Sequence, residues 1–361
     1  MPPLTGRATP SRAEDSQALS SGRSLVWVFP KPEQAPVNLT WTDQPERCLG
    51  RDPGCDVCII GKQVSRRHAS LTPAAAGGVR IQDLESRNGT RVNGHHITSA
   101  ELGPGDVVRL GSWVGVVTHA PSHFEEVGPG LFGGASLQAV LAPLKLAAKS
   151  THAVVLEGET GTGKETVAKS LHAWSGRSGA FVSLSCPTLA QGSGDEAALL
   201  GSASSSFEHA AGGTLLLADV SHLPVRVQGK LLHLLQQEAK RFDVRLVIAE
   251  AESLGAAARD GRFDEQLLAS LDVHTVRLPP LRRRREDVPG IFLGLLRSLA
   301  GREIEVDSDL IEKLCLHDWP FNVRELVTLT RLLLTAHGNE ALLSEKHLPD
   351  RFSAIATDRS S

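Results

Sequence analysis

The sequence predicts an all-β sandwich followed by an α/β domain with a helical C-terminal part. Three observations lead to this prediction. Short apolar runs of period two, separated by Gly, Pro and Asn turns, fill the stretch from Leu25 to about Val117. After Ala135, strand and helix patterns alternate, which is typical of a parallel sheet covered by helices. From about Arg285 onward the pattern is helical only.

Length and composition fit this multidomain fold. A chain of 361 residues suggests about two domains, and 41% hydrophobic with 22% charged residues is enough to build cores. The net charge of −3 and the aromatic content of 4%, without Tyr, give no reason to expect nucleic-acid binding. No apolar run reaches the roughly 18 residues of a membrane span, and the N-terminus lacks the apolar core of a secretory signal. We therefore expect a cytoplasmic protein without a membrane partner.

The cysteines give no sign of a metal site. Five cysteines, an odd count in a chain without an export signal, fit a reducing compartment. Cys55 and Cys58 form a C-x-x-C pair, but no second pair follows at ligand spacing. Because a zinc site needs four ligands, we interpret these two cysteines as ordinary residues near a strand.

The elements follow from the apolar pattern in chain order. In the first domain the many short predicted strands include 25–29, 56–60, 79–84 and 106–111. The stretch 119–134 is rich in Gly and Pro and shows no clear period, which favours a linker or a domain-entry loop. In the second domain the pattern predicts helices at 136–150 and 164–176, and strands at 151–158, 181–186, 214–219 and 244–250.

Four short motifs lie at turns of the β domain: Gly50-Arg51, Ser65-Arg66-Arg67-His68, Asn88-Gly89-Thr90 and Asn93-Gly94. Turns at one end of a sandwich converge in space, and binding residues often lie on such loops. Two arginines and a serine hydroxyl there provide the charge-assisted hydrogen bonds that hold a phosphate. An asparagine could bridge to a peptide backbone. Alternatively, each motif alone could be an ordinary hairpin turn or a solvated basic stretch.

Together these motifs resemble the forkhead-associated (FHA) domain, a β-sandwich that recognises phosphothreonine peptides. The resemblance covers about residues 25–118. It implies a phosphothreonine-containing partner, such as a Ser/Thr kinase or its substrate. It also implies a structural role for His68 beneath the loop. The residues that it places against the peptide are Arg51, Ser65, Arg66 and Asn88.

A second motif, GETGTGKE, follows a predicted strand and opens a helix. Its G-x-x-x-x-G-K frame cradles phosphates with backbone N–H groups, and its lysine reaches the outer phosphates. Glu165 stands where the generic motif has Ser or Thr for magnesium, so the sequence predicts ATP binding and leaves magnesium open. The predicted nucleotide-binding residues of the loop are Gly158, Glu159, Thr160, Gly161, Thr162, Gly163, Lys164 and Glu165.

Five strings resemble the AAA+ domain of sigma-54-dependent transcriptional activators over about residues 132–352: GETGTGKE, GGTLLL, DVRLVIA, RLPPLRRRREDVP and WPFNVREL. This resemblance implies a P-loop AAA+ domain with a small helical lid, and assembly through that domain into homo- or hetero-oligomers. It also implies that Arg324 contacts the nucleotide phosphates. An amphipathic lid helix with a surface arginine is the alternative for WPFNVREL.

The sequence departs from that family at its catalytic positions. Ala218-Asp219 replaces Asp-Glu, and Glu250-Ala251 replaces Thr-Asn. Two further arginines, which the family supplies to the neighbouring subunit, are replaced by Asp264 and Ser270. An arginine finger contributes on the order of 10³ to 10⁵ to the rate of phosphoryl transfer. These departures predict nucleotide binding without turnover and no catalytic residues.

Two further departures concern partners. The family's G-A-F-T-G-A loop, which touches the sigma factor, is absent from 198–214, and no helix-turn-helix follows the lid. We therefore expect neither sigma-54 contact nor direct DNA binding. Three hypotheses result: a non-enzymatic regulator, an active sigma-54-dependent ATPase, or a phosphopeptide reader whose AAA+ half only packs.

The motifs divide the chain into six segments. They are a disordered tail (1–23), the FHA-like domain (24–118), a linker (119–133), the α/β nucleotide-binding subdomain (134–284), the lid (285–352) and a second tail (353–361).

Overall fold

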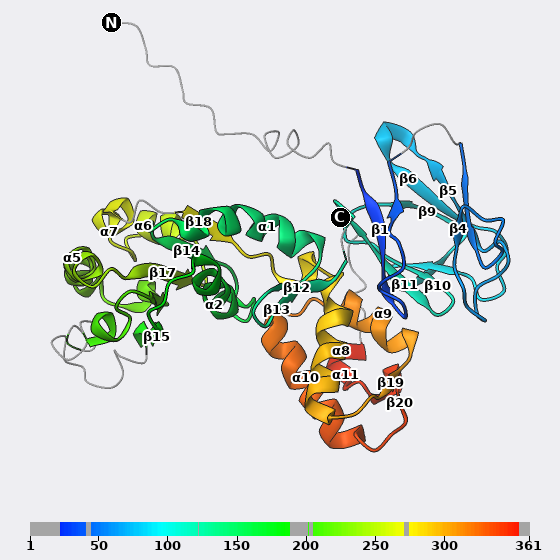
Figure 1. Cartoon of the computed structure of the whole chain (residues 1–361). Helices are drawn as coiled ribbons and strands as arrows, with labels where there is room; N and C mark the ends of the chain where they lie inside the picture. Colours follow the sequence, from blue (N-terminus) through cyan, green and yellow to red (C-terminus); the bar gives the residue numbers. More distant parts are fainter. Residues whose placement is uncertain are drawn as a thin grey trace, which may run out of the picture.

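The computed structural model describes residues 22–40, 45–121, 123–187, 201, 205–270 and 274–353. Within these ranges it confirms the predicted fold class: an antiparallel β-sandwich, a parallel α/β domain and a helical lid. Figure 1 shows the sandwich and the α/β domain on opposite sides, with the lid helices beside both. Most of both predicted tails and part of 198–214 lie outside the described residues.

Two sheets form the sandwich. One has the order β2-β1-β11-β10-β7-β8 and the other the order β4-β3-β5-β6-β9. Trp27, Leu49, Leu71 and Trp113 are among the fully buried residues between them. The strands are β1 Ser24–Phe29, β2 Val37–Asn38, β3 Arg47–Gly50, β4 Val57–Cys58, β5 Ala69–Pro73, β6 Val79–Asp83, β7 Thr90–Val92, β8 His95–Ile97, β9 Ser99–Leu102, β10 Val107–Leu110 and β11 Trp113–Thr118.

The predicted linker contains a hairpin. Strands β12 (Glu125–Gly128) and β13 (Leu131–Gly133) pair antiparallel across a two-residue turn. Gly130 in that turn has a φ of 66°, a conformation that suits glycine. Val127 and Leu131 join the apolar core of the α/β domain, so the segment is anchored to that domain.

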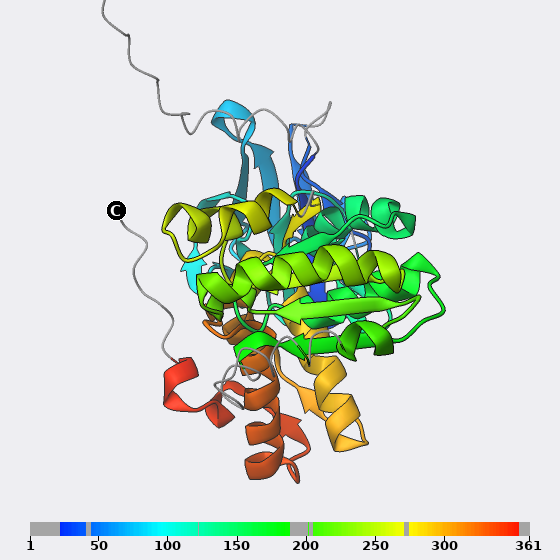
Figure 2. The ribbon, with the colours of Figure 1, turned by 90° about the vertical axis from the view of Figure 1, so that its left-hand side faces the viewer.

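The α/β domain has a five-stranded parallel sheet of order β15-β16-β17-β14-β18. Helices α1 and α2 cover one face, while α5, α6 and α7 cover the other, and Figure 2 shows α5 crossing the side turned to the viewer. The carboxyl ends of the strands meet at one edge of a parallel sheet, where ligands bind in such folds. The elements are α1 Ala135–Leu146, β14 Val154–Glu157, α2 Lys164–Ser175, β15 Phe181–Ser185, β16 Thr214–Ala218, α5 Val225–Arg241, β17 Arg245–Glu250, α6 Leu254–Arg259, α7 Glu265–Ser270 and β18 His274–Arg277.

The lid is built from helices α8 Asp287–Ala300, α9 Ser308–Leu316, α10 Asn322–His337 and α11 Asp350–Ser353. It also contains a parallel pair of two-residue strands, β19 (Glu305–Val306) and β20 (Leu342–Leu343), where the sequence predicts helices only. Strands of this length are too short to show a period of two.

The lid buries one face of the sandwich. Val28 of β1, Val107 of β10, and Val114 and Val116 of β11 share an apolar core with α8, α9 and α10. Side chains alternate across a strand, so the neighbouring Val108 faces the sandwich core instead. The sandwich and the lid are therefore one packed body, although the α/β domain separates them in the chain.

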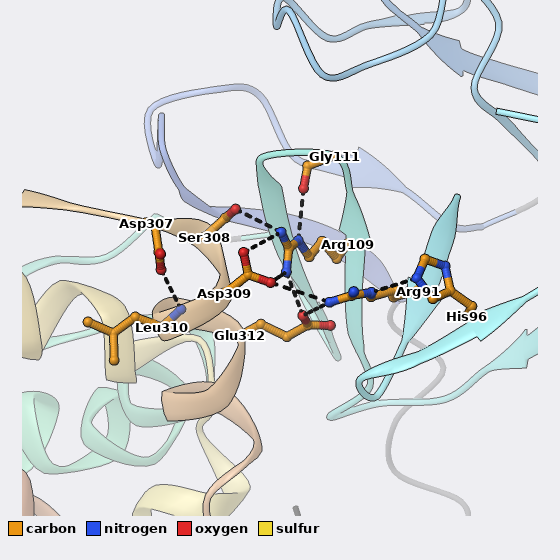
Figure 3. A network of polar contacts seen from close by, with 9 residues as sticks. All are labelled: Arg91, His96, Arg109, Gly111, Asp307, Ser308, Asp309, Leu310 and Glu312. Carbon is orange, nitrogen blue, oxygen red and sulfur yellow. Dashed lines mark hydrogen bonds and ion pairs between the residues drawn. The ribbon is translucent and has the colours of Figure 1, made fainter. Parts of the chain in front are cut away.

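A polar cluster, which we call the lid clamp, borders this apolar contact (Figure 3). The guanidinium of Arg109, a residue that is 9% exposed, donates to Ser308 Oγ at 3.0 Å, to Asp309 at 2.5 and 3.1 Å, and to Glu312 Oε2 at 2.9 Å. Arg91 donates to the same Glu312 oxygen at 3.2 Å. Hydrogen bonding from Arg109 holds the pKa of Asp309 below its ordinary value. The clamp consists of Arg91, Arg109, Ser308, Asp309 and Glu312.

Candidate functional sites

The structure brings the predicted phosphopeptide residues onto adjoining loops at one end of the sandwich. The backbone N–H of Arg51 donates to Ser65 O at 3.0 Å, which joins the loop after β3 to the loop before β5. The amide of Asn88 donates to Gln63 O at 2.7 Å, and Ser65 Oγ accepts from Arg87 N at 3.0 Å. The side chains of Arg51, Arg66 and Asn88 are exposed, so this end presents cations and an amide to solvent.

His68 lies beneath these loops and is fully buried. Its Nδ1 accepts from Ser65 N at 3.0 Å, so its Nε2 carries the proton and donates to Gly89 O at 3.2 Å. Burial lowers the pKa of this imidazole, which favours the neutral ring that both hydrogen bonds require. These contacts confirm the structural role predicted for His68.

Asp83 supports the third loop and was not predicted from the sequence. Its carboxylate accepts from Thr90 Oγ1 at 2.6 Å, from Ser86 Oγ at 2.7 Å and from Ser86 N at 3.0 Å. Burial opposes ionisation, but these hydrogen bonds hold the pKa of Asp83 below its ordinary value. The turn that carries Asn88 is thereby tied to the end of β6.

The second candidate site is the glycine loop between β14 and α2. Gly161 and Gly163 have φ values of 83° and 102°, which suit glycine. Helix α2 begins at Lys164, so its first free N–H groups face the loop and form a site for an anion. The amine of Lys164 donates to Gly158 O at 2.5 Å and to Glu159 O at 3.2 Å.

Charges around Lys164 come from three other elements. Burial is the main cause that lowers the pKa of Lys164. Asp219 after β16 and Glu250 of β17 act to raise that pKa, while Arg324 of α10 acts to lower it. The structure thus brings Arg324 and Lys164 near one loop, as a phosphate site requires.

The lid holds the glycine loop through several residues that were not predicted from the sequence. The carboxylate of Glu159 accepts from Arg282 at 2.5 and 2.8 Å, which lowers the pKa of Glu159. Buried Asn322 donates to Thr160 O at 3.0 Å and accepts from Leu281 N at 2.7 Å. Figure 1 shows α10, which begins at this asparagine, reaching toward the α/β domain.

Two further contacts fasten the loop to the lid. Val323 N donates to Gly161 O at 3.0 Å, and Arg284 donates to Thr162 O at 2.8 Å. A Cβ atom on Gly161 would lie 2.2 Å from Phe321 O and 3.1 Å from the Cβ of Arg324. The start of α10 therefore sits directly on the loop, and a movement of the lid has to change the loop's surroundings.

The residues at the departures from the family pattern have defined local roles. Ala218 ends β16, and Asp219 has a φ of 58° and donates its N–H to Ala249 O at 2.9 Å. Glu250 is fully buried, and its carboxylate accepts from Ser221 N at 3.0 Å and from Ser221 Oγ at 2.8 Å. Burial raises the pKa of Glu250.

Asp264 and Glu165 are likewise engaged locally. Asp264 accepts from Leu267 N at 2.8 Å in the first turn of α7. Glu165 pairs with Lys169 on the exposed surface of α2 at 2.9 Å. The side chain of Ser270 lies outside the described part of the chain.

The described residues contain no group of three or more His, Cys, Asp or Glu side chains that could hold a metal ion. None of the helices within these ranges is long and apolar enough to cross a membrane.

Family models match three consecutive parts of the chain: an FHA domain at residues 47–111, a sigma-54 interaction domain at 133–281 and an AAA+ ATPase lid domain at 282–361. The DNA-binding transcriptional regulator NtrC of Escherichia coli (strain K12) is 31% identical over 333 residues, which cover 82% of this chain and 69% of NtrC. The chain belongs to the sigma-54 activator family of AAA+ proteins.

Several other relatives match between half and three fifths of the chain. The phenol regulator MopR of Acinetobacter guillouiae is 37% identical over 226 residues, covering 55% of this chain and 40% of MopR. The chain spans less than half the length of MopR and of other curated relatives. Among solved structures, NtrX of Brucella abortus in complex with ATP has a TM-score of 0.53 and 26% identity, covering 62% of this chain and 57% of NtrX.

Proposed function

We propose that this protein is a phosphothreonine-dependent regulator of the sigma-54 activator family, which binds ATP without hydrolysing it and does not contact sigma-54. The observation that carries the proposal is the contrast within the AAA+ part. The glycine loop has glycines at positive φ before the start of α2, and it is attached to the lid. The expected catalytic positions carry Ala218, which has no polar side chain, and Glu250 and Asp264, whose carboxylates accept hydrogen bonds from Ser221 and Leu267.

Nucleotide binding is supported by the loop itself. Binding asks for backbone N–H donors at a helix start and for cations near the outer phosphates. The start of α2 supplies the donors, and Lys164 and Arg324 supply the cations. The NtrX structure described above contains ATP. A second NtrX structure, which is 25% identical with a TM-score of 0.54, contains ADP.

The absence of turnover follows from what hydrolysis additionally requires. A metal must be placed and a water polarised, and developing charge must be stabilised. Ala218 offers no ligand for a metal, and Glu165 pairs with Lys169 at the position where the generic motif has a hydroxyl. Glu250 is fixed by Ser221, and Asp264 adds a negative charge where the family has an arginine.

The N-terminal domain is the proposed sensor. Exposed Arg51 and Arg66, the hydroxyl of Ser65 and the amide of Asn88 lie on loops that hydrogen-bond to one another. A phosphate between two guanidinium groups receives charge-assisted hydrogen bonds from both. The proposed partner is a protein that carries phosphothreonine, namely a Ser/Thr kinase or its substrate.

An active ATPase is the second candidate. One observation favours it: Asp219 and Glu250 both influence the pKa of Lys164, so two carboxylates are near the outer-phosphate region. Calorimetry with ATP, combined with phosphate release by the purified full chain, separates the candidates. We expect binding that Lys164→Ala abolishes, and no release above the level of that variant. Steady release from the wild type that Lys164→Ala stops would refute the proposal.

A further inference from the structure

Two cysteines meet beneath the phosphopeptide loops. The Sγ atoms of Cys48 and Cys55 are 2.8 Å apart. Cys58, the other cysteine of the C-x-x-C motif, points its thiol to Arg51 O at 3.9 Å. A disulfide bond is about 2.05 Å long, so the two sulfurs of the pair have to approach by less than about 1 Å.

The backbone holds the pair in place. Cys48 lies in β3, and its N–H donates to Asp56 Oδ2 at 2.7 Å, which folds the following turn back onto the strand. Within that turn Cys55 N donates to Asp52 O at 3.0 Å, and Gly54 N donates to Asp52 Oδ1 at 2.9 Å. The turn therefore presents Cys55 to Cys48 as part of the fold.

We propose that Cys48 and Cys55 are a reversible thiol–disulfide site that controls the phosphopeptide loops. The oxidant is a peroxide. Cys48, the more accessible of the two, attacks one peroxide oxygen, breaks the O–O bond and becomes a sulfenic acid as the first water leaves. Cys55 then attacks the sulfenic sulfur, and its proton leaves with the hydroxyl as the second water. Two thiols and one hydrogen peroxide yield one disulfide and two waters.

Cys186 and Cys315 differ from this pair because each lies alone in an apolar core. Cys186 and Cys315 are buried in the cores of the α/β domain and the lid. Burial raises the pKa of Cys186 to about 12, and burial also raises the pKa of Cys315. Burial and the neighbouring Cys48 raise the pKa of Cys55 to about 12, which fits a second step rather than the first attack on peroxide.

The backbone carbonyl of Arg66 connects the cysteine pair to the proposed phosphate-binding loop. The Cys55 thiol donates to Arg66 O at 3.4 Å, and the same oxygen accepts from Asp52 N at 3.1 Å. A Cβ on Gly50 would lie 2.0 Å from Arg66 O, so strand and loop are in close contact. When Cys55 turns to bond Cys48, Arg66 O loses the thiol donor and the turn from Asp52 to Cys55 moves. Arg66 and Ser65 lie on the loop that this contact supports.

Peptide mapping of the full chain tests the site. After treatment with hydrogen peroxide, we expect the protein to lose the mass of two hydrogens and to yield one cross-linked peptide pair containing Cys48 and Cys55. Dithiothreitol should reverse both changes. Cys48→Ser should prevent the link, and the matched control Cys58→Ser, in β4 just after the turn, should leave it intact. A link between Cys55 and Cys58, or no link at all, would overturn the proposal.

The regulatory consequence rests on the proposed phosphopeptide function and has its own readout. We expect oxidation to lower phosphothreonine-peptide affinity about tenfold, the size of one charge-assisted hydrogen bond. Cys48→Ser should make the affinity insensitive to peroxide. Unchanged affinity in a fully cross-linked protein would refute control by the disulfide. If the reduced protein ignores the phosphopeptide while the link still forms, the proposed function fails and the thiol–disulfide site stands.

Discussion

Replacing Arg109 by alanine should loosen the sandwich from the lid. The substitution removes every hydrogen bond that its guanidinium donates to Ser308, Asp309 and Glu312. Glu312 is 4% exposed, so its carboxylate stays buried after the substitution. Within the clamp, Arg91 is then the one cation that still donates to it, at 3.2 Å. Breaking a buried ion pair by removing one partner costs roughly 3–5 kcal/mol. Because Arg91 remains, we expect the lower end, about 3 kcal/mol.

Guanidinium denaturation of the full chain, followed by tryptophan fluorescence, measures this loss. Trp27 and Trp113 report on the sandwich core, and Trp319 reports on the lid core. Arg80→Ala is the matched control, because the pair of Arg80 with Glu101 is exposed and such pairs contribute at most about 1 kcal/mol. A loss for Arg109→Ala no larger than for Arg80→Ala would show that the apolar contact alone joins the two parts.

The clamp also predicts an acid-sensitive contribution to stability. The pKa of Asp309 lies below its ordinary value of 3.8 in the folded chain, chiefly because Arg109 donates hydrogen bonds to it. The contribution of Asp309 to the free energy of unfolding is therefore fully present above pH 3.8. It is lost as the pH falls through the lower pKa that Asp309 has in the folded chain. The stability difference between wild type and Arg109→Ala should shrink over that range. A difference that stays constant to the lowest pH would contradict this assignment.

Three other predictions concern binding and activity. Arg51→Ala should weaken phosphothreonine-peptide binding about tenfold or more, because a charge-assisted hydrogen bond contributes about 1.5–3 kcal/mol; peptide arrays that show equal binding with and without phosphate would argue against this. Lys164→Ala should abolish nucleotide binding in calorimetry, and Ala218→Asp alone should not produce phosphate release; release from that variant would show that one carboxylate suffices. With ATP and a sigma-54 promoter in a purified system, we expect no open complexes; their appearance would reveal a sigma-contacting surface in this chain.

Local pattern was enough to predict most of the fold. The period of two in the first part and the alternation of strands and helices in the second lead to the sandwich and the parallel sheet, because the longer elements there, such as β1, β11 and β17, span six residues each. The hairpin at Glu125–Gly133 was missed because its strands are short and contain glycine. The strands β19 and β20, of two residues each, carry no readable period.

Contacts between distant residues could not be predicted. Arg109 and Asp309 are 200 residues apart in the chain, and neither lies in a motif. The spacing of the cysteines gave no sign that the fold of the turn brings Cys48 to Cys55. Asn322 lies within a string that resembles the family, but its attachment to Thr160 O depends on how the lid packs. The individual roles of Arg51, Ser65, Arg66, Asn88 and Arg324 stay predictions.

The four valines on the outer face of the sandwich affect how the N-terminal domain behaves when it is produced as an isolated fragment. A fragment that ends near residue 118 would expose Val28, Val107, Val114 and Val116 to water, and a fully buried valine side chain stabilises a fold by roughly 1.5 kcal/mol or more. Exposed patches of this kind promote aggregation. The partner of that face begins only after the α/β domain, so the α/β domain is inserted between two parts that share an apolar core. A chimera that replaces the sandwich with a homologous domain would therefore have to replace the lid surface that contacts it as well.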